Sequence, residues 1–360
     1  MPDPAAVHSV LEALQRQTNR PWTLMEVCGG QTHTILRWGL DQLLPGGLQL
    51  IHGPGCPVCV TPATTIDQAL QLAARSEVIL CSFGDMLRVP GSRSDGGVSD
   101  LLQARAAGAD VRLITAPLQT LDLAARHPDR QVVLLAAGFE TTAPATALLL
   151  EQARRLAVDN LSLLAAHVRV VPAMERLSAD PHNQIQGFLA AGHVAAVMGT
   201  AELEALVQRR HLPVVVCGFN PLELLQALLA CVQLLEAGTP RLANAYGGVV
   251  RSQGNPAARL LVQQVFAAAD GPWRGLSPIS RGVLQLRPPY HRFDARQRFG
   301  LPLPQAAEED GPCCGAAVLQ GRCKPPDCPS FATACTPLHP LGAPMVSHEG
   351  ACAAYYAYRR

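Results

Sequence analysis

The stretch 132–139, which reads VVLLAAGF, decides the fold class. It is apolar throughout, carries no charge and does not alternate between apolar and polar residues. Such a run, closed by a small-residue turn, is typical of a strand that is buried on both faces of a parallel sheet. Runs with a similar ending at 78–84 and 214–219 indicate that the pattern is repeated along the chain.

Helical segments separate these apolar runs. The periodicity predicts an amphipathic helix over 5–17, and Asn220-Pro221 and Asn255-Pro256 each place a capping side chain and a first-turn proline before a helix. We expect the first of these helices to run to about Glu236 and the second to cover 257–268. Shorter apolar runs predict further strands at 111–115, 161–166 and 194–198. Alternating strands and helices predict right-handed βαβ units.

The fold class predicted from this pattern is α/β, with two similar doubly wound parallel-sheet domains and a Pro/Cys-rich C-terminal iron–sulfur domain. We expect a helix within 1–20 that packs on the C-terminal domain, α/β domains over 21–128 and 129–245, and the cluster domain over 246–360. After about residue 270 prolines dominate, so we expect irregular structure that the cysteines hold together. In open α/β sheets, sites form at the carboxyl ends of strands.

The composition excludes several classes of protein. The 360 residues are 48% hydrophobic, and the net charge is +1 with no basic block, which argues against nucleic acid as the main partner. No apolar run is long enough to span a membrane, and no signal peptide precedes the first helix, so we expect a cytoplasmic protein without a membrane partner. Twelve cysteines in such a chain favour metal or redox chemistry.

Three of the cysteines lie early in the chain. Cys56 and Cys59 form a C-x-x-C motif in a Gly/Pro-rich turn, and Cys28 follows another apolar run. The motif fits a thioredoxin-like dithiol, half of a metal site, or a structural pair in a tight turn. Together with Cys28 it predicts a three-sulfur site that leaves open positions on a soft metal.

Six further cysteines gather at the C-terminus. Cys323, Cys328, Cys335 and Cys352 follow one another in a loop-rich segment, with Cys313 and Cys314 upstream. Four thiolates in such a segment suit a [4Fe–4S] cluster or structural zinc, and the presence of only one short gap favours iron–sulfur. Disulfides or free thiols are the alternative, and the spacing does not select four ligands from the six.

Other side chains have a functional and a structural interpretation. Asp85 and Glu140 follow predicted strands, where a carboxylate can act as an acid or base or simply cap a helix. His33 lies five residues after Cys28 and either orients a ligand or moves a proton, or is a surface histidine. His167 and His182 follow a strand and are weaker candidates. We expect three cysteines to be small buried residues: Cys81, Cys217 and Cys231.

Five segments resemble the HypD family of hydrogenase maturation factors: EVCGGQTHT at 26–34, HGPGCPVC at 52–59, SFGDMLRVPG at 82–91, GFETT at 138–142 and VSHEGACAAYY at 346–356. The resemblance runs nearly end to end. It implies a part in assembling the Fe(CN)2CO group of [NiFe]-hydrogenases, with the chaperone HypC as partner and with cyanide from HypE and HypF. It also implies two similar α/β domains and a cluster-bearing domain.

The resemblance further implies roles for individual residues. Cys28, Cys56 and Cys59 match the iron-associated cysteines, and Asp85 and Glu349 fall in family motifs. The [4Fe–4S] cysteines are matched by Cys328, Cys335 and Cys352, with Cys314 as the fourth ligand and Cys313 and Cys323 as alternates. Two rival functions remain, which are a cluster-dependent thiol–disulfide oxidoreductase and a zinc-stapled scaffold. The sequence leaves open whether the protein is an enzyme or a carrier.

Overall fold

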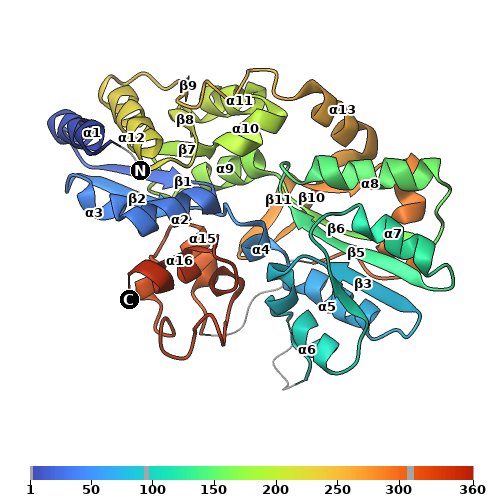
Figure 1. The fold of residues 1–360 in the computed structure, drawn as a ribbon. Coiled ribbons are helices and arrows are strands. Elements are labelled where there is room, and N and C mark those ends of the chain that lie inside the picture. Colours follow the sequence, from blue (N-terminus) through green and yellow to red (C-terminus); the bar gives the residue numbers. More distant parts are fainter. Residues whose placement is uncertain (1–2, 93–96, 306–311, 360) are drawn as a thin grey trace.

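The fold contains two parallel sheets, each with helices on both faces (Figure 1). It is seen in a computed structural model that describes residues 3–92, 97–305 and 312–359. Sheet A has the strand order β2–β1–β7–β8–β9, formed by Leu48–His52, Trp22–Glu26, Gly187–Ala191, Val214–Cys217 and Leu242–Asn244. Sheet B has the order β4–β3–β5–β6, formed by Val111–Leu113, Val78–Ser82, Gln131–Gly138 and Leu161–His167. The predicted α/β class with parallel sheets is therefore confirmed.

The chain passes between the two sheets more than once. It builds β1 and β2 of sheet A, then all four strands of sheet B, and then returns to sheet A for β7, β8 and β9. The predicted domains 21–128 and 129–245 differ from this arrangement, because each range contributes strands to both sheets. The repeated strand–turn–helix pattern identifies strands but carries no information on which strands pair.

Sheet A is covered on both faces, which explains why its strands are mostly apolar. One face packs against α2 (Gly29–Trp38) and α12 (Pro221–Glu236), and the other against α9 (Val170–Ser178), α10 (Gly192–Met198) and α11 (Ala201–Arg210). The N-terminal helix α1 (Pro4–Gln17) packs on α12, with Leu14 fully buried. This contact corrects the prediction that the helix packs on the C-terminal domain.

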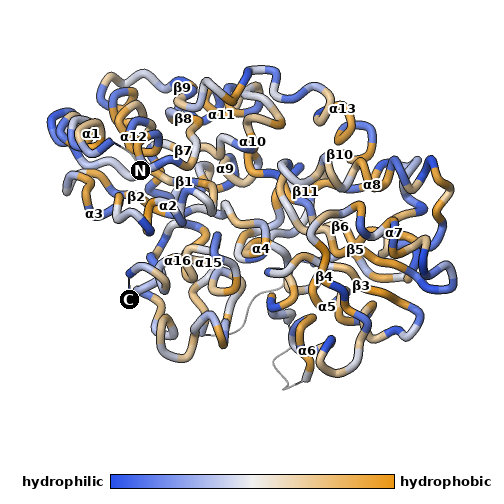
Figure 2. Tube along the Cα trace, viewed as in Figure 1, coloured by the Kyte–Doolittle hydropathy of each residue, from blue (hydrophilic) through white to orange (hydrophobic). Residues whose placement is uncertain are grey.

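Sheet B is covered in the same way. On one face lie α5 (Ala63–Ala73), η1 (Asp85–Arg88) and α6 (Leu101–Ala106), and on the other α7 (Gln119–Arg126) and α8 (Ala143–Arg155). Figure 2 shows hydrophobic residues concentrated in the strands and in the helix faces that contact them. The short helices α3 (Leu40–Leu43) and α4 (Pro57–Val60) lie in the loops of sheet A.

The predicted caps are confirmed, but one helix end and one strand differ from the prediction. Asn220 and Asn255 each accept a hydrogen bond from the first turn of their helix. The second helix, α13 (Pro256–Val265), ends earlier than predicted because the chain enters a strand at Phe266. The strand predicted at 194–198 is wrong, since these residues lie in α10 and the strand is β7, just upstream. A short apolar run does not by itself distinguish a strand from a buried helix.

The region after residue 246 also differs from the prediction. β10 (Phe266–Trp273) and β11 (Leu276–Leu286) form an antiparallel hairpin, and η2 (Pro288–Phe293) and α14 (Ala295–Phe299) follow it. Helix α13 packs on α8, and β11 and α14 pack on β6, so this region belongs to sheet B rather than to a cluster domain. Register shifts within the hairpin disturb the alternation that predicts strands.

The cysteine-rich segment itself covers 312–359. It contains α15 (Gly315–Leu319), η3 (Pro325–Asp327), η4 (Ala343–Met345) and α16 (Ala351–Tyr358). Helix α16 packs on α2 and so brings the end of the chain against sheet A, as Figure 1 shows. Within the described ranges, no helix combines the length and apolar character needed to cross a membrane.

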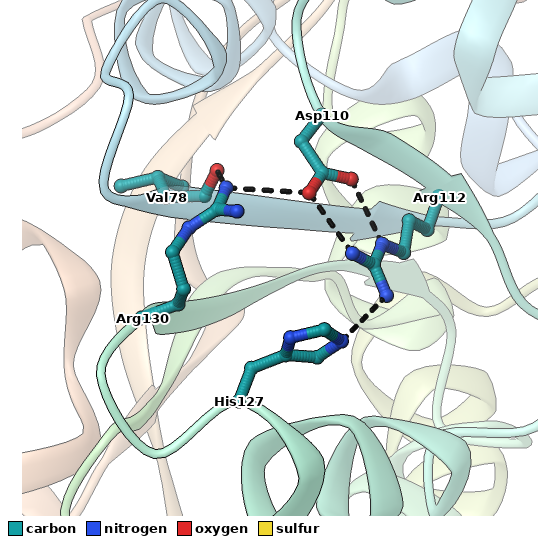
Figure 3. A network of polar contacts seen from close by, with 5 residues as sticks. All are labelled: Val78, Asp110, Arg112, His127 and Arg130. Atoms are coloured by element: carbon teal, nitrogen blue, oxygen red, sulfur yellow. Dashed lines mark hydrogen bonds and ion pairs between the residues drawn. The ribbon is translucent and has the colours of Figure 1, made fainter.

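A polar network joins the amino ends of β3, β4 and β5 in sheet B (Figure 3). The Asp110 carboxylate accepts hydrogen bonds from Arg112 Nε at 2.8 Å and from Arg130 Nη2 at 3.2 Å. Arg130 also donates to the carbonyl oxygen of Val78, and the Arg112 guanidinium contacts the His127 ring. The bond from Arg112 lowers the pKa of Asp110 and keeps it charged. Both arginines at this end of the sheet are therefore paired with one carboxylate.

Candidate functional site

The strand order of sheet A creates a crevice between β1 and β7. The chain continues from β1 to β2 on one side, whereas β7 pairs with β1 on the other, so the loops after β1 and β7 diverge. Ligand sites of open α/β sheets form at such a switch point, at the carboxyl ends of the strands. Cys28 follows β1 and His193 follows β7, and the Cys28 Sγ lies 3.8 Å from the His193 Nδ1.

Cys28 is held as a neutral thiol in this crevice. It precedes the first turn of α2 and is 2% exposed. Burial raises the pKa of its thiol to about 12, and the nearby charge of Glu26 adds to the effect. Burial also lowers the pKa of His193, so the imidazole beside the thiol is neutral. The pair therefore combines a proton donor with a free base.

The C-x-x-C motif lies beside Cys28, as the sequence predicts for the carboxyl ends of neighbouring strands. The Gly29 N–H donates to the Gly55 carbonyl oxygen at 2.9 Å, and a Cβ on Gly55 would lie 2.4 Å from the Cys28 Cα. Only glycine allows the two loops to approach so closely.

Cys56 and Cys59 themselves form a disulfide across α4. Their sulfurs are therefore not thiolate ligands in this state. The three-sulfur metal site stays a prediction.

A buried pair beneath these loops was missed by the sequence analysis. The Glu26 carboxylate, which is fully buried, accepts hydrogen bonds from the Cys28 N–H at 2.9 Å and from the Thr32 hydroxyl. It also contacts the His52 Nδ1 at 2.7 Å. The available signal was a single ionisable residue at the end of each of the two strands, β1 and β2. A buried carboxylate with this many partners fixes the backbone that carries Cys28.

Helix α16 reaches this pair from the other side. The Tyr355 ring lies edge-on to His52, with 5.5 Å between the ring centres. The structure places the predicted candidate His33 in the same helix interface, where its Nε2 lies 3.1 Å from the Tyr358 hydroxyl. Burial lowers the pKa of His33, so its ring is neutral there. His33 therefore joins α2 to α16.

The predicted carboxylates Asp85 and Glu349 meet beside Cys28, although they lie far apart in the sequence. The Ser347 hydroxyl donates to Asp85 Oδ2 at 2.6 Å. A Cβ on Gly29 would lie 2.5 Å from the Glu349 Cβ, so Glu349 packs directly on the residue after Cys28. Burial, and then the charge of Asp85, raise the pKa of Glu349.

Glu140 occupies the corresponding position in sheet B. It follows β5, which borders the switch point between β3 and β5, and it is 2% exposed. Its carboxylate accepts a hydrogen bond from the Val170 N–H at 3.1 Å, at the start of α9. Burial raises the pKa of Glu140 to about 7. This bond satisfies a backbone N–H at the start of α9, and the catalytic role predicted for Glu140 stays a prediction.

Five C-terminal cysteines surround one small pocket in the segment 312–359. They are Cys313, Cys314, Cys328, Cys335 and Cys352. Cys323 does not line this pocket, although its pKa responds to Cys314 and Cys328. Within the described residues no three His, Cys, Asp or Glu side chains are arranged to hold a single metal ion.

The thiols around this pocket influence one another's pKa. Burial alone would raise the pKa of Cys328, but backbone N–H groups and the Cys314 thiol outweigh burial and lower it. The hydrogen bond to Cys328 raises the pKa of Cys314 in turn. Burial, and then the neighbouring cysteines, raise the pKa of Cys352. One of these thiols is therefore prepared to lose its proton before the others.

The remaining cysteine and histidine candidates differ in their burial. The expectation that Cys81, Cys217 and Cys231 are buried is confirmed, since each is fully buried. His182 is exposed, whereas His167 is buried with its pKa lowered to about 4. His193 was missed because the strand that precedes it was predicted seven residues too late.

Comparisons with known proteins cover almost the whole chain. The family model described as "HypD: Hydrogenase formation hypA family" matches residues 5–359. The chain is 44% identical to the hydrogenase maturation factor HypD of Escherichia coli K12, over 99% of this chain and 96% of that protein. It is 45% identical to the hydrogenase expression/formation protein HupD of Azotobacter chroococcum, over 97% and 92% respectively. It is also 43% identical to HypD of Cupriavidus necator, over 94% and 90%.

Proposed function

The chain belongs to the HypD family of hydrogenase maturation factors, and from that premise we propose that Cys28 binds the iron of the Fe(CN)2CO group while the group is assembled. The observation that carries the proposal is the position of Cys28 at the switch point of sheet A, beside a neutral histidine. Iron that carries CO and cyanide favours strongly donating thiolate ligands. The iron is the cargo of the site.

His193 gives the thiol a route to its charged form. The Cys28 thiol must lose its proton when the Fe–S bond forms, and burial makes that loss unfavourable in the free protein. The His193 Nδ1, at 3.8 Å, is placed to accept this proton. The arriving positive charge of the metal offsets the cost of the buried thiolate.

The Cys56–Cys59 pair adds two further sulfurs once it is reduced. Two electrons and two protons convert the disulfide to two thiols, and deprotonated thiols next to the Cys28 loop complete the predicted three-sulfur site. The disulfide must therefore be reduced before the iron can be held by all three sulfurs.

We propose that the C-terminal cysteines hold a [4Fe–4S] cluster, because the thiols around this pocket supply the donor set that such a cluster needs. A four-iron cluster is wider than a single ion, so its ligands stand around a cavity, as these cysteines do. We assign the ligands to Cys314, Cys328, Cys335 and Cys352, with Cys313 as the alternate that also lines the pocket. A cluster bound there supplies electrons one at a time. Helix α16, which carries Cys352, extends from this pocket to the His52–Glu26 pair.

The partners follow from the family. We propose that HypC contributes a further sulfur ligand to the iron, and that HypE, loaded by HypF, delivers the cyanide. The Cys28 crevice is the place for these exchanges, because Asp85 and Glu349 meet beside it.

A second candidate function is a cluster-dependent thiol–disulfide oxidoreductase. The disulfide between Cys56 and Cys59 favours it, because a dithiol that cycles through this state needs no bound iron. In that case Cys28 would take no part in the reaction.

Anaerobic purification with HypC, followed by an infrared spectrum and iron analysis, tests the two functions. We expect bands from CO and cyanide and more than about four irons per chain. Cys28→Ala should remove the bands and the extra iron but keep the visible absorbance of the cluster, whereas the buried control Cys231→Ala should keep all three. Unchanged bands in Cys28→Ala would contradict the proposal, and their absence from the unaltered protein would favour the oxidoreductase.

A further inference from the structure

Cys28 is closed off from solvent, which constrains how anything can reach it. Its side chain is 2% exposed, and the neighbouring Cys56 and Cys59 are 2% and 0% exposed. The proposed function requires an iron ion, and a sulfur of a partner protein, to approach the Cys28 Sγ. An element beside Cys28 must therefore move, and the contacts of these elements indicate which of them is held least firmly.

Two elements beside Cys28 belong to sheet A itself. The loop after β2 is joined to the residue after Cys28 by a hydrogen bond from the Gly29 N–H to the Gly55 carbonyl oxygen, at 2.9 Å. On another side His193 lies in the first turn of α10, directly after β7. Both elements continue strands that pair with β1, so neither can move far without disturbing the sheet.

A third element is the strap, which we define as residues 346–350 and which joins η4 to α16. It lies at the surface, since His348 is exposed. It also covers the start of α2, where a Cβ on Gly29 would lie 2.5 Å from the Glu349 Cβ. Among the described residues no hydrogen bond joins the strap to α2 or to the loop of Cys28, so its contact with this side is one of packing.

The side-chain hydrogen bonds that hold the strap come from the other sheet. Arg88, in η1, donates from Nη2 to the Val346 carbonyl oxygen and from Nη1 to the Pro337 carbonyl oxygen, both at 2.9 Å. Asp85, at the start of η1, accepts a hydrogen bond from the Ser347 hydroxyl at 2.6 Å. Individual hydrogen bonds contribute little to stability, so a contact of this kind opens far more often than the sheets unfold.

We propose that the strap is a gate over Cys28 and that Arg88 and Asp85 are the positioning residues that keep it closed. Opening breaks the three hydrogen bonds to η1 and lifts Glu349 from Gly29, which exposes the thiol to an incoming metal. Closure returns the thiol to its buried environment. The purpose of the gate rests on the proposed function, whereas the gate itself can be tested without the cargo iron.

Alkylation of Cys28 in the full-length protein, purified from cells that lack HypC, tests the gate. Mass spectrometry of peptides gives the rate at which N-ethylmaleimide labels Cys28 and, as an internal reference, the fully buried Cys217. The labelling rate follows the fraction of open molecules, so we expect Arg88→Met to raise it at least about 10-fold at Cys28 and to leave Cys217 unchanged. Asp85→Ala should raise it less, because it breaks one hydrogen bond rather than two.

Arg298→Met is the matched control. The Arg298 guanidinium also donates two hydrogen bonds, to the Gln131 side chain and to the Arg292 carbonyl oxygen, and neither acceptor lies in the strap. This variant should therefore leave the labelling rate of Cys28 unchanged.

Glu349→Gly opens the gate in a different way. It keeps Arg88 and Asp85 but removes the side chain that packs on Gly29, so the labelling rate of Cys28 should again rise. This variant decides the question if Arg88→Met does not fold, which a parallel rise at Cys217 would reveal.

An unchanged labelling rate of Cys28 in a folded Arg88→Met protein would overturn the proposal, and so would an unchanged rate in Glu349→Gly. The infrared test of the proposed function is independent of this measurement. Absence of the CO and cyanide bands would contradict the iron chemistry but not the gate, whereas unchanged labelling would contradict the gate but not the iron chemistry.

Discussion

Sheets A and B share one topology but use it differently. In each sheet the chain turns to one side and later returns on the other, which leaves a crevice between β1 and β7 in sheet A and between β3 and β5 in sheet B. Sheet A places a thiol and a histidine in its crevice. In sheet B the corresponding carboxylate, Glu140, caps a helix. The difference teaches that topology selects where a site can form, whereas the side chains left without a structural partner decide whether one does.

Exchanging one cysteine in each sheet should give the largest contrast. Cys28→Ala removes a proposed direct ligand of the iron. Loss of a residue that only supports a metal ligand typically lowers metal affinity or activity about 10–100-fold, so we expect Cys28→Ala to lower hydrogenase maturation at least about 100-fold. Cys81→Ala, in the interior of β3, should leave maturation within about twofold and lower only stability. Hydrogenase activity in cells that depend on each variant measures both. Equal losses of hydrogenase maturation in the two variants would contradict the assignment of the site to sheet A.

Glu26→Gln should destabilise sheet A. The amide keeps the shape of the carboxylate but weakens its bonds to the Cys28 N–H, Thr32 and His52, so we expect a loss of about 3 kcal/mol in the free energy of unfolding. Urea denaturation of the metal-free protein measures it. The control is Glu236→Gln, a half-buried carboxylate that accepts a hydrogen bond from Trp22 of the same sheet, and this variant should have a much smaller effect. Similar losses in both variants would show that the buried network has no special role.

Glu140 should give sheet B a characteristic pH dependence. The pKa of its carboxyl is raised from 4.5 to about 7 in the folded state, so the folded protein binds this proton more tightly than the unfolded chain. The stabilisation is complete below about pH 4.5 and is lost as the pH rises through about 7. We expect a fall of about 3 kcal/mol in the free energy of unfolding over this window, and a shallower fall in Glu140→Gln. Parallel curves for the two proteins would contradict the assignment.

The smallest effect concerns the contact between the sheet B loop and the C-terminal segment. Asp85→Ala removes the acceptor for the Ser347 hydroxyl and should cost about 1 kcal/mol. Asp85→Asn keeps an acceptor and should cost less, while it removes the charge that raises the pKa of Glu349. Denaturant titration ranks the two variants. The reverse order would mean that charge, and not the hydrogen bond, holds this contact.

Much of the fold follows from local sequence. Apolar runs identify most of the strands, and Asn-Pro pairs locate the starts of α12 and α13, because capping and strand burial are decided within a few residues. Local sequence does not predict which strands belong to which sheet, since strand pairing depends on contacts between segments that are distant in the chain. The β10–β11 hairpin was missed for a similar reason, because its irregular register blurs the alternation of its side chains.

The candidate site shows the same limit. Cys28, Cys56 and Cys59 were placed together because strand ends of a parallel sheet meet at one edge. His193 was missed because the strand before it was misplaced. The Glu26–His52 pair was missed because a buried polar contact between two strand ends leaves no spacing pattern in the sequence. The meeting of Glu349 with Gly29 depends on tertiary packing, and the family motif was the only sequence feature that indicated it.

The passage of the chain between the sheets dictates an order of assembly during synthesis. Sheet B is contiguous from β3 to β6, so its strands can pair while the rest of the chain is still on the ribosome. Sheet A stays incomplete until β7, β8 and β9 emerge, and α16 docks on α2 only when the last residues are made. The surroundings of Cys28 are therefore completed last. A chain whose synthesis stops early contains Cys28 but lacks His193 and the packed helices that keep this thiol buried and neutral.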